Sequence, residues 1–144
     1  MTIAIMPVQL ASIWIAVGAV HLQEVRGAVT WVPLPGAPAH LPGVVPWRGR
    51  AIAVLDLGGL LGVAPPVRVT EPRPRTLIAQ VEDTTFAIPA DTVREVHTVV
   101  AIEESHAAQV RHAYGQVVIG GQVMPVIDLA HALAALVRPQ ADPR

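Results

Sequence analysis

The sequence predicts an all-β protein made of two small, similar β-barrels. Apolar residues alternate with polar or small residues over short runs, as in half-buried strands, and tight-turn signals separate these runs at even spacing. The second half of the chain also repeats the pattern of the first. With 144 residues the chain has the size of one domain, so we expect a single domain over 1–144.

An internal repeat organises this domain. Leu22–Val25 matches Val93–Val96 at a shift of 71 residues, and Val54–Leu57 matches Val126–Leu129 at a shift of 72. A period of half the chain predicts two copies of one supersecondary unit. The copies cover approximately residues 6–62 and 76–137, joined by a proline-rich connector over 63–75.

Each copy is expected to begin with a hairpin, followed by one helical turn and a short strand. The residues Glu82-Asp83-Thr84 favour a turn in the hairpin of the second copy, and Ala11-Ser12 has this place in the first. The predicted elements are hairpins Met6–Leu10 with Ile13–Val17 and Leu77–Val81 with Thr85–Ile88, helical turns near Leu22–Val25 and Thr92–Val96, and strands Val29–Val32 and Thr98–Ile102.

A second hairpin then ends at an aspartate in each copy. Its turns, Arg48-Gly49-Arg50 and Gly120-Gly121-Gln122, contain the glycine that supplies the positive φ of a tight hairpin. Asp56 and Asp128 each stand just before a short predicted helix, where an aspartate accepts hydrogen bonds from free backbone N–H groups. We therefore expect both to be helix caps rather than a catalytic pair. The predicted helices are Leu57–Leu61 and Leu129–Leu136.

The uncharged start of the chain, Met1–Val20, is apolar and long enough to suggest a transmembrane helix. Its apolar residues alternate at period two, however, and no Lys or Arg forms the positive region of a signal peptide. We therefore predict strands in this segment, no direct membrane insertion and a cytoplasmic location.

Composition and motifs argue against nucleic-acid binding, metal binding and catalysis. Ten Arg, with no Lys, balance eleven acidic residues, so no basic surface for nucleic acid is predicted, and the absence of cysteine excludes thiolate metal sites. No phosphate-binding glycine loop or G-x-S-x-G elbow occurs, so we do not expect an enzyme. The six histidines lack the spacing of a helical metal site, and neither a metal nor a cofactor is expected: His21, His40, His97, His106, His112 and His131.

Two charged residues stand out as candidates for binding. Glu24 has a counterpart in the repeat, Glu95, which favours a role common to both copies. Arg48 corresponds to Gly120, so this arginine belongs to the first copy alone. Arg48 follows Trp47 at a hairpin tip, and arginine and tryptophan are typical anchors of protein interfaces. At this position Arg48 would be suited to bind a carboxylate group of a partner protein.

Three blocks together resemble the bacterial chemotaxis coupling protein family CheW: Leu22–Gly27, Leu41–Arg50 and Val54–Leu57. The family pattern is roughly V-Q-E-I, then G-V-[IVT]-N-L-R-G, then P-[IV]-[IV]-D-L, and the resemblance extends over about 6–137. Pro46-Trp47 stands here in place of the Asn-Leu of this pattern. Ala53 replaces the proline that opens the last block of the pattern, although the second copy keeps Pro125. Because proline cannot donate a ladder hydrogen bond, Pro46 is predicted at an edge or a bulge.

The resemblance implies two SH3-like five-stranded β-barrels that form a non-enzymatic adaptor of a chemosensory pathway such as motility. Its implied partners are the cytoplasmic tip of a methyl-accepting chemoreceptor and the regulatory domain of a CheA-type histidine kinase, with the protein at the periphery of membrane receptor arrays. Glu24, Gly43 and Arg48 match receptor-binding positions, and Leu41 and Pro42 match a segment associated with the kinase contact. An apolar groove between the barrels, rimmed by Glu24 and Arg48, would take the helical hairpin of the receptor.

Two alternatives stay open. A CheW-like protein that binds a receptor but no kinase is compatible with the change at Pro46-Trp47, which lies close to the expected binding edge. A small-ligand-binding β-barrel would line its pocket with Trp14, Trp31 and Trp47 and would show ligand-dependent tryptophan fluorescence.

Overall fold

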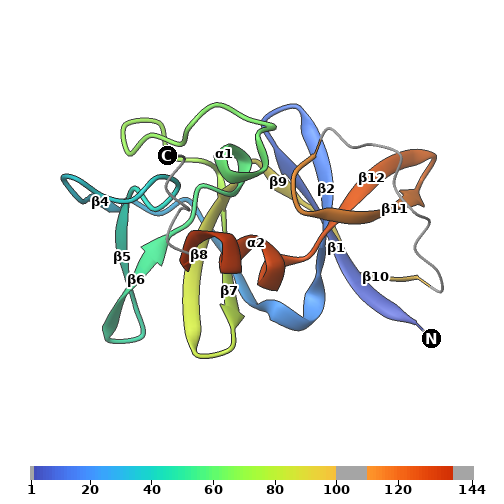
Figure 1. Cartoon of the computed structure of the whole chain (residues 1–144), viewed down its shortest axis with the longest axis horizontal. Helices are drawn as coiled ribbons and strands as arrows, with labels where there is room; N and C mark the ends of the chain where they lie inside the picture. Colours follow the sequence, from blue (N-terminus) through green and yellow to red (C-terminus); the bar gives the residue numbers. More distant parts are fainter. Residues whose placement is uncertain (1, 100–109, 138–144) are drawn as a thin grey trace, which may run out of the picture.

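The computed structural model describes residues 2–99 and 110–137, which form two six-stranded β-sheets and two short α-helices (Figure 1). In spatial order, sheet A consists of β10 (His97–Val99), β1 (Ile3–Leu10), β2 (Ile13–Gly18), β12 (Gln122–Ile127) and β11 (Ala113–Ile119), with β9 (Thr92–Val93) also paired to β1. Sheet B consists of β3 (Leu22–Gly27), β7 (Arg75–Val81), β8 (Thr84–Ala90), β6 (Arg50–Val54), β5 (Gly43–Trp47) and β4 (Val32–Pro33). The helices are η1 (Ala19–His21, 3₁₀), α1 (Leu57–Leu61) and α2 (Leu129–Val137).

The prediction of an all-β fold with two β-rich units and short helices is confirmed. Each sheet has six strands where the resemblance implied five, because the sheets include very short strands. The strands β4 and β9 contain two residues each. Runs of that length carry no alternation that a sequence could show.

The two sheets exchange their first hairpins between the halves of the chain. The hairpin β1–β2 of the first half joins the strands of the second half, because β2 pairs in parallel with β12. In the same way the hairpin β7–β8 of the second half joins the first, because β8 pairs in parallel with β6. The boundary between the sheets therefore differs from the boundary between the sequence repeats, and each repeat contributes strands to both sheets.

The predicted tight turns are confirmed by left-handed backbone at their centres. In the hairpin β5–β6, Arg48 and Gly49 have φ of 48° and 78°. Gly120 and Gly121 have φ of 57° and 78° in the equivalent hairpin β11–β12. Two successive positive φ values are the type I′ geometry, whose twist matches that of the flanking strands. Of the four residues, Arg48 alone has a Cβ that opposes this conformation.

The helical turns predicted near Leu22–Val25 and Thr92–Val96 are wrong. The residues Leu22–Gly27 form β3, which pairs with β7, and the helical turn η1 comes just before it. The strand β9 occupies the start of the other segment and pairs with β1. In both places hydrogen bonding to a strand distant in sequence overrides the local pattern.

The strand predicted at Val29–Val32 is reduced to its last residue, which opens β4. The strand β10 covers the beginning of the strand predicted at Thr98–Ile102, whose end lies outside the described residues. The predicted strands in Met1–Val20 are confirmed as β1 and β2. None of the helices within residues 2–99 and 110–137 has the length and hydropathy of a membrane span.

Both aspartates cap a helix, as predicted. Asp56 accepts a hydrogen bond from the backbone N–H of Gly59 at 3.1 Å, and Asp128 accepts one from the backbone N–H of His131 at 3.2 Å. Their own backbone N–H groups donate to the carbonyls of His40 and His112, at 2.9 and 3.4 Å. These two histidines are themselves one repeat apart, and both have a left-handed backbone. The internal repeat is therefore present as repeated hydrogen bonding.

Candidate protein-interaction surface

A cluster of charged residues surrounds Trp47 at the end of the hairpin β5–β6. The indole Nε1 of Trp47 donates a hydrogen bond to Oε1 of Glu24, which lies on β3. The same oxygen lies 3.1 Å from Nε of Arg26, two residues further along β3. The hydrogen bond between Trp47 and Glu24 connects β5 to β3, an edge strand from which three strands separate it in the order of sheet B.

Two further arginines face the indole ring of Trp47. The Cζ atom of Arg48 lies 4.7 Å from the ring centre, and that of Arg50 lies 5.5 Å from it. Both distances allow cation–π attraction. Arg50 also donates to Oγ1 of Thr85 on β8 at 2.9 Å, which fixes its side chain. We call Glu24, Arg26, Trp47, Arg48 and Arg50 the Trp47 cluster; with three arginines and one glutamate it has a formal charge of +2.

The carboxylate of Glu24 is stabilised in its ionised form. The hydrogen bond from Trp47, and then the charges of Arg26 and Arg48, hold the pKa of Glu24 below its ordinary value, against the opposing effect of burial. Because the pKa is lowered on folding, the ionised group contributes stability above its ordinary pKa. This contribution is lost as the pH falls through the lowered value.

Replacing Trp47 by phenylalanine is expected to raise the pKa of Glu24 towards its ordinary value. The change removes the hydrogen bond that lowers this pKa most. An NMR titration of the Glu24 carboxyl carbon measures the shift directly. In the control Trp14→Phe, which alters a tryptophan of sheet A, the pKa should stay lowered. An equal Glu24 pKa in wild type and Trp47→Phe would show that the indole is not the principal cause.

The structure thus brings together two of the residues predicted from the sequence, Glu24 and Arg48, although they come from different strands. The sequence also places Trp47 next to Arg48, whereas Arg26 and Arg50 are not among the candidates predicted from it. A signal for Arg26 is its spacing, since it lies two positions from Glu24 on one strand and so shares its face. Arg50 is the cross-strand neighbour of Trp47 across the hairpin turn. The repeat partner Glu95 lies outside the strands, and Ile119 stands where a counterpart of Trp47 would be. The cluster therefore belongs to the first copy.

Pro46 lies at an edge, as predicted. The strand β4 pairs with β5 only at Gly43 and Val44, so the outer side of β5 at Pro46 has no neighbouring strand among the described residues. A proline there removes no ladder hydrogen bond on that side. The unusual Pro46-Trp47 pair therefore keeps the hairpin intact and places an indole beside Glu24.

Gly43 lies at the other end of β5, away from the Trp47 cluster, and is buried. A Cβ built on it would lie 2.2 Å from the carbonyl oxygen of Val32 and 2.6 Å from Cε3 of Trp31. The absence of a side chain lets β4 and the Trp31 ring pack directly on β5. This packing explains a glycine here without any contact to a partner.

Gly43→Ala is accordingly expected to destabilise the fold by about 1–3 kcal/mol through overpacking. The control is Gly27→Ala, because a Cβ at Gly27 meets nothing within 4 Å. Urea unfolding followed by far-UV circular dichroism compares the two variants. Equal free energies of unfolding for both would contradict the packing role of Gly43.

Leu41 and Pro42 lie apart from the Trp47 cluster, just before β5. Leu41 lines an apolar groove of about 480 Å³ between α2 and strands of sheet B, and it packs against the main core. In Figure 1, α2 follows β12 and lies across this part of sheet B. Glu24 and Arg48 are not among the residues that line this groove, so they do not form its rim as expected. The lining residues are Leu41, Ala53, Val81, Glu82, Thr84, Phe86, Ala130, Leu133, Ala134 and Leu136.

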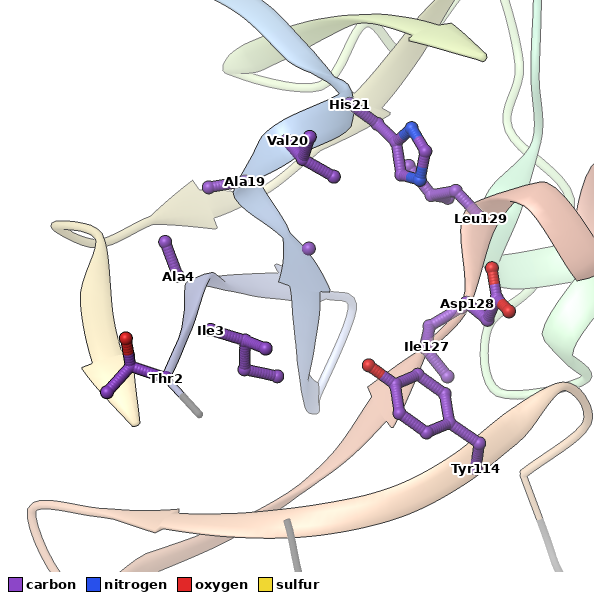
Figure 2. A pocket seen from close by; sticks show the side chains of 11 residues that line it. Thr2, Ile3, Ala4, Ala19, Val20, His21, Tyr114, Ile127, Asp128 and Leu129 are labelled. Carbon is purple, nitrogen blue, oxygen red and sulfur yellow. The ribbon is translucent and has the colours of Figure 1, made fainter. Parts of the chain in front are cut away.

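A second hollow, of about 650 Å³, lies between η1 and the junction of β12 with α2 (Figure 2). Figure 2 shows His21 and Val20 on one side and Tyr114 and Asp128 on the other. Burial and the charge of Asp128 raise the pKa of the Tyr114 hydroxyl. Trp14, Trp31 and Trp47 line neither this hollow nor the groove; Trp31 and Trp47 are buried in the core of sheet B. The tryptophan-lined pocket of the small-ligand alternative therefore has no support at either place.

The fold and the site define a class of protein: a double-sheet β-protein that presents a tryptophan–arginine cluster at the edge of one sheet. The chain belongs to the CheW-like domain family, whose profile matches residues 4–136. Its structure is similar to that of the scaffolding protein TtCheW from Thermoanaerobacter tengcongensis, with a TM-score of 0.77 and 20% identity over 92% of this chain and 88% of the other. At that identity the likeness shows the fold.

Two curated relatives are similar in sequence. The chemotaxis protein CheW of Rhizobium meliloti (strain 1021) is 31% identical over 80 residues, which are 54% of this chain and 49% of the relative. A probable chemotaxis protein CheW of Rhizobium etli is 29% identical over 85 residues, covering 58% of this chain and 52% of the relative. The chain thus aligns with about half the length of these relatives.

Proposed function

We propose that this protein is a non-enzymatic adaptor that couples the cytoplasmic tips of methyl-accepting chemoreceptors to a CheA-type histidine kinase. Family membership supports the adaptor class. The observation that carries the proposal for this chain is the convergence of Glu24 and Arg48 on Trp47. These residues match the receptor-binding positions of the family, and they form one surface although they are distant in sequence.

The Trp47 cluster has the chemistry of a receptor contact. Arg48 is exposed and lies on the face of a buried indole, so a rigid ring supports its guanidinium. Glu24 is 28% exposed and Arg26 44% exposed, which leaves both partly available. An arginine on an aromatic face can bind a partner carboxylate through two hydrogen bonds, while Glu24 accepts from donors of the partner. A helical receptor tip with both kinds of polar group would fit this surface.

The proposed kinase contact involves Leu41 and Pro42 and the apolar groove beside α2. Leu41 and Pro42 come just before β5, and Trp47 is the last residue of this strand. The two ends of β5 are roughly 14 Å apart. The two partners could therefore bind side by side. Weak binding at each surface would gain strength when many copies assemble in receptor arrays. The protein would act in the cytoplasm at the membrane receptors.

The proposal is tested by measuring two binary affinities with calorimetry. The full chain is titrated with the signalling hairpin of a chemoreceptor and, separately, with the regulatory domain of the kinase from the same bacterium. Binding to both supports the adaptor, and Leu41→Ala should weaken the kinase arm alone. Binding to the receptor without the kinase would make the protein a specialised receptor regulator. Binding to neither would refute the function.

A further inference from the structure

A pair of histidines in the second half of the chain has no counterpart in the first. The Nδ1 atoms of His112 and His131 lie 3.0 Å apart, and their ring centres are 5.1 Å apart at an interplanar angle of 56°. His112 stands in the turn before β11, and His131 is in the first turn of α2. The two rings are therefore held by different elements that meet at this point.

The first half of the chain has only one imidazole at the corresponding place. At a shift of 72 residues, His112 corresponds to His40 and His131 corresponds to Gly59. The carbonyls of His40 and His112 make the same hydrogen bond to a capping aspartate, which explains the repeated backbone. Gly59 leaves no space for a side chain, because a Cβ would lie 2.5 Å from Oδ2 of Asp56. The second imidazole is thus an addition that helix capping does not explain.

We propose that His112 and His131 form a surface site for a divalent late transition metal ion such as Cu²⁺, Ni²⁺ or Zn²⁺. Imidazole nitrogen is a preferred ligand of these ions. Two nitrogens that share one metal at about 2.0–2.1 Å are separated by about 2.9–3.3 Å, and the observed 3.0 Å falls in this range. The ion would replace the proton that the two nitrogens share.

The remaining coordination positions would be filled by water. The described residues contain no group of three or more His, Asp or Glu side chains placed to hold a metal, so this part of the chain supplies two ligands. The contact between the two imidazole rings is exposed to solvent, so water can coordinate an ion bound there. A bound ion would fix the turn before β11 to the start of α2, the helix that lines the apolar groove.

Calorimetric titration of the tag-free full chain with Cu²⁺, Ni²⁺ and Zn²⁺ tests the site. We expect one equivalent to bind and Mg²⁺, which prefers oxygen ligands, to give no signal. His131→Gly, which copies the first half, and His112→Asn, which tolerates the left-handed backbone, should each weaken binding at least about tenfold. The control His40→Asn should leave the affinity unchanged. Unchanged binding in both variants, or no saturable binding to wild type, would overturn the site.

A second measurement on the unaltered chain does not depend on the folding of any variant. Addition of Zn²⁺ to ¹⁵N-labelled protein should shift the Nδ1 resonances of His112 and His131 together. Shifts confined to other histidines, such as His21 or His97, would overturn the assignment.

Discussion

Trp47→Ala is expected to lower the free energy of unfolding by about 3–5 kcal/mol, the cost of removing a buried aromatic side chain. The Trp47 side chain is 6% exposed and packs in a cluster with Trp31, Val45, Ile52 and others inside sheet B. Its loss also removes the hydrogen bond between β5 and β3. The loss is a large part of the about 5–15 kcal/mol that stabilises a typical domain.

Urea unfolding followed by far-UV circular dichroism measures this loss without relying on tryptophan fluorescence. Trp14→Ala is the matched control, because Trp14 is only partly buried beside the core of sheet A and should cost less. Trp47→Phe should fall between wild type and Trp47→Ala, since it keeps most of the apolar volume. A Trp47→Ala variant within about 0.5 kcal/mol of wild type, the range of a neutral surface change, would contradict a packing role for the indole.

Arg48→Ala is expected to weaken receptor binding by at least about 30-fold, which corresponds to a hot-spot loss of about 2 kcal/mol. The arginine is exposed, so its removal should change the free energy of unfolding by no more than about 0.5 kcal/mol. Affinity for the receptor hairpin and urea unfolding are measured on the same variant. Binding to the kinase domain should be retained, since Leu41 and Pro42 are untouched.

Two further variants serve as comparisons for Arg48→Ala. Arg48→Gly copies the turn Gly120–Gly121 and relieves the left-handed backbone at φ 48°, so it should be at least as stable as wild type and still lose receptor binding. Arg68→Ala changes an exposed arginine of the connector and should bind normally. Normal receptor binding by Arg48→Ala would remove Arg48 from the interface.

The sequence predicted those parts of the fold that depend on local chemistry. The hairpin turns followed from Gly49 and Gly121, whose positive φ is a local requirement, and the caps followed from the aspartates that precede each helix. Each is determined by a few adjacent residues. The same kind of reasoning failed for β3, because its pairing with β7 joins residues about 50 positions apart.

The exchange of hairpins between the halves could not be predicted either. Both copies carry the same hairpin pattern, so pairing of β2 with its own half or with the other half is equally consistent with the sequence.

The contacts within the candidate site also depend on residues that are distant in sequence. Glu24 and Arg48 were each identified by their place in the sequence, but the indole that brings them together acts across 23 residues. The contact of His112 with His131 also becomes visible only when α2 meets the turn before β11.

We propose that one copy of this protein binds a receptor and a kinase at the same time. The most direct test mixes the full chain with the receptor hairpin and the kinase regulatory domain and determines the mass of the particle by sedimentation. We expect a ternary particle that contains all three, and Arg48→Ala should reduce it to the pair with the kinase. Displacement of one partner by the other, with only binary particles at saturating concentrations, would contradict it.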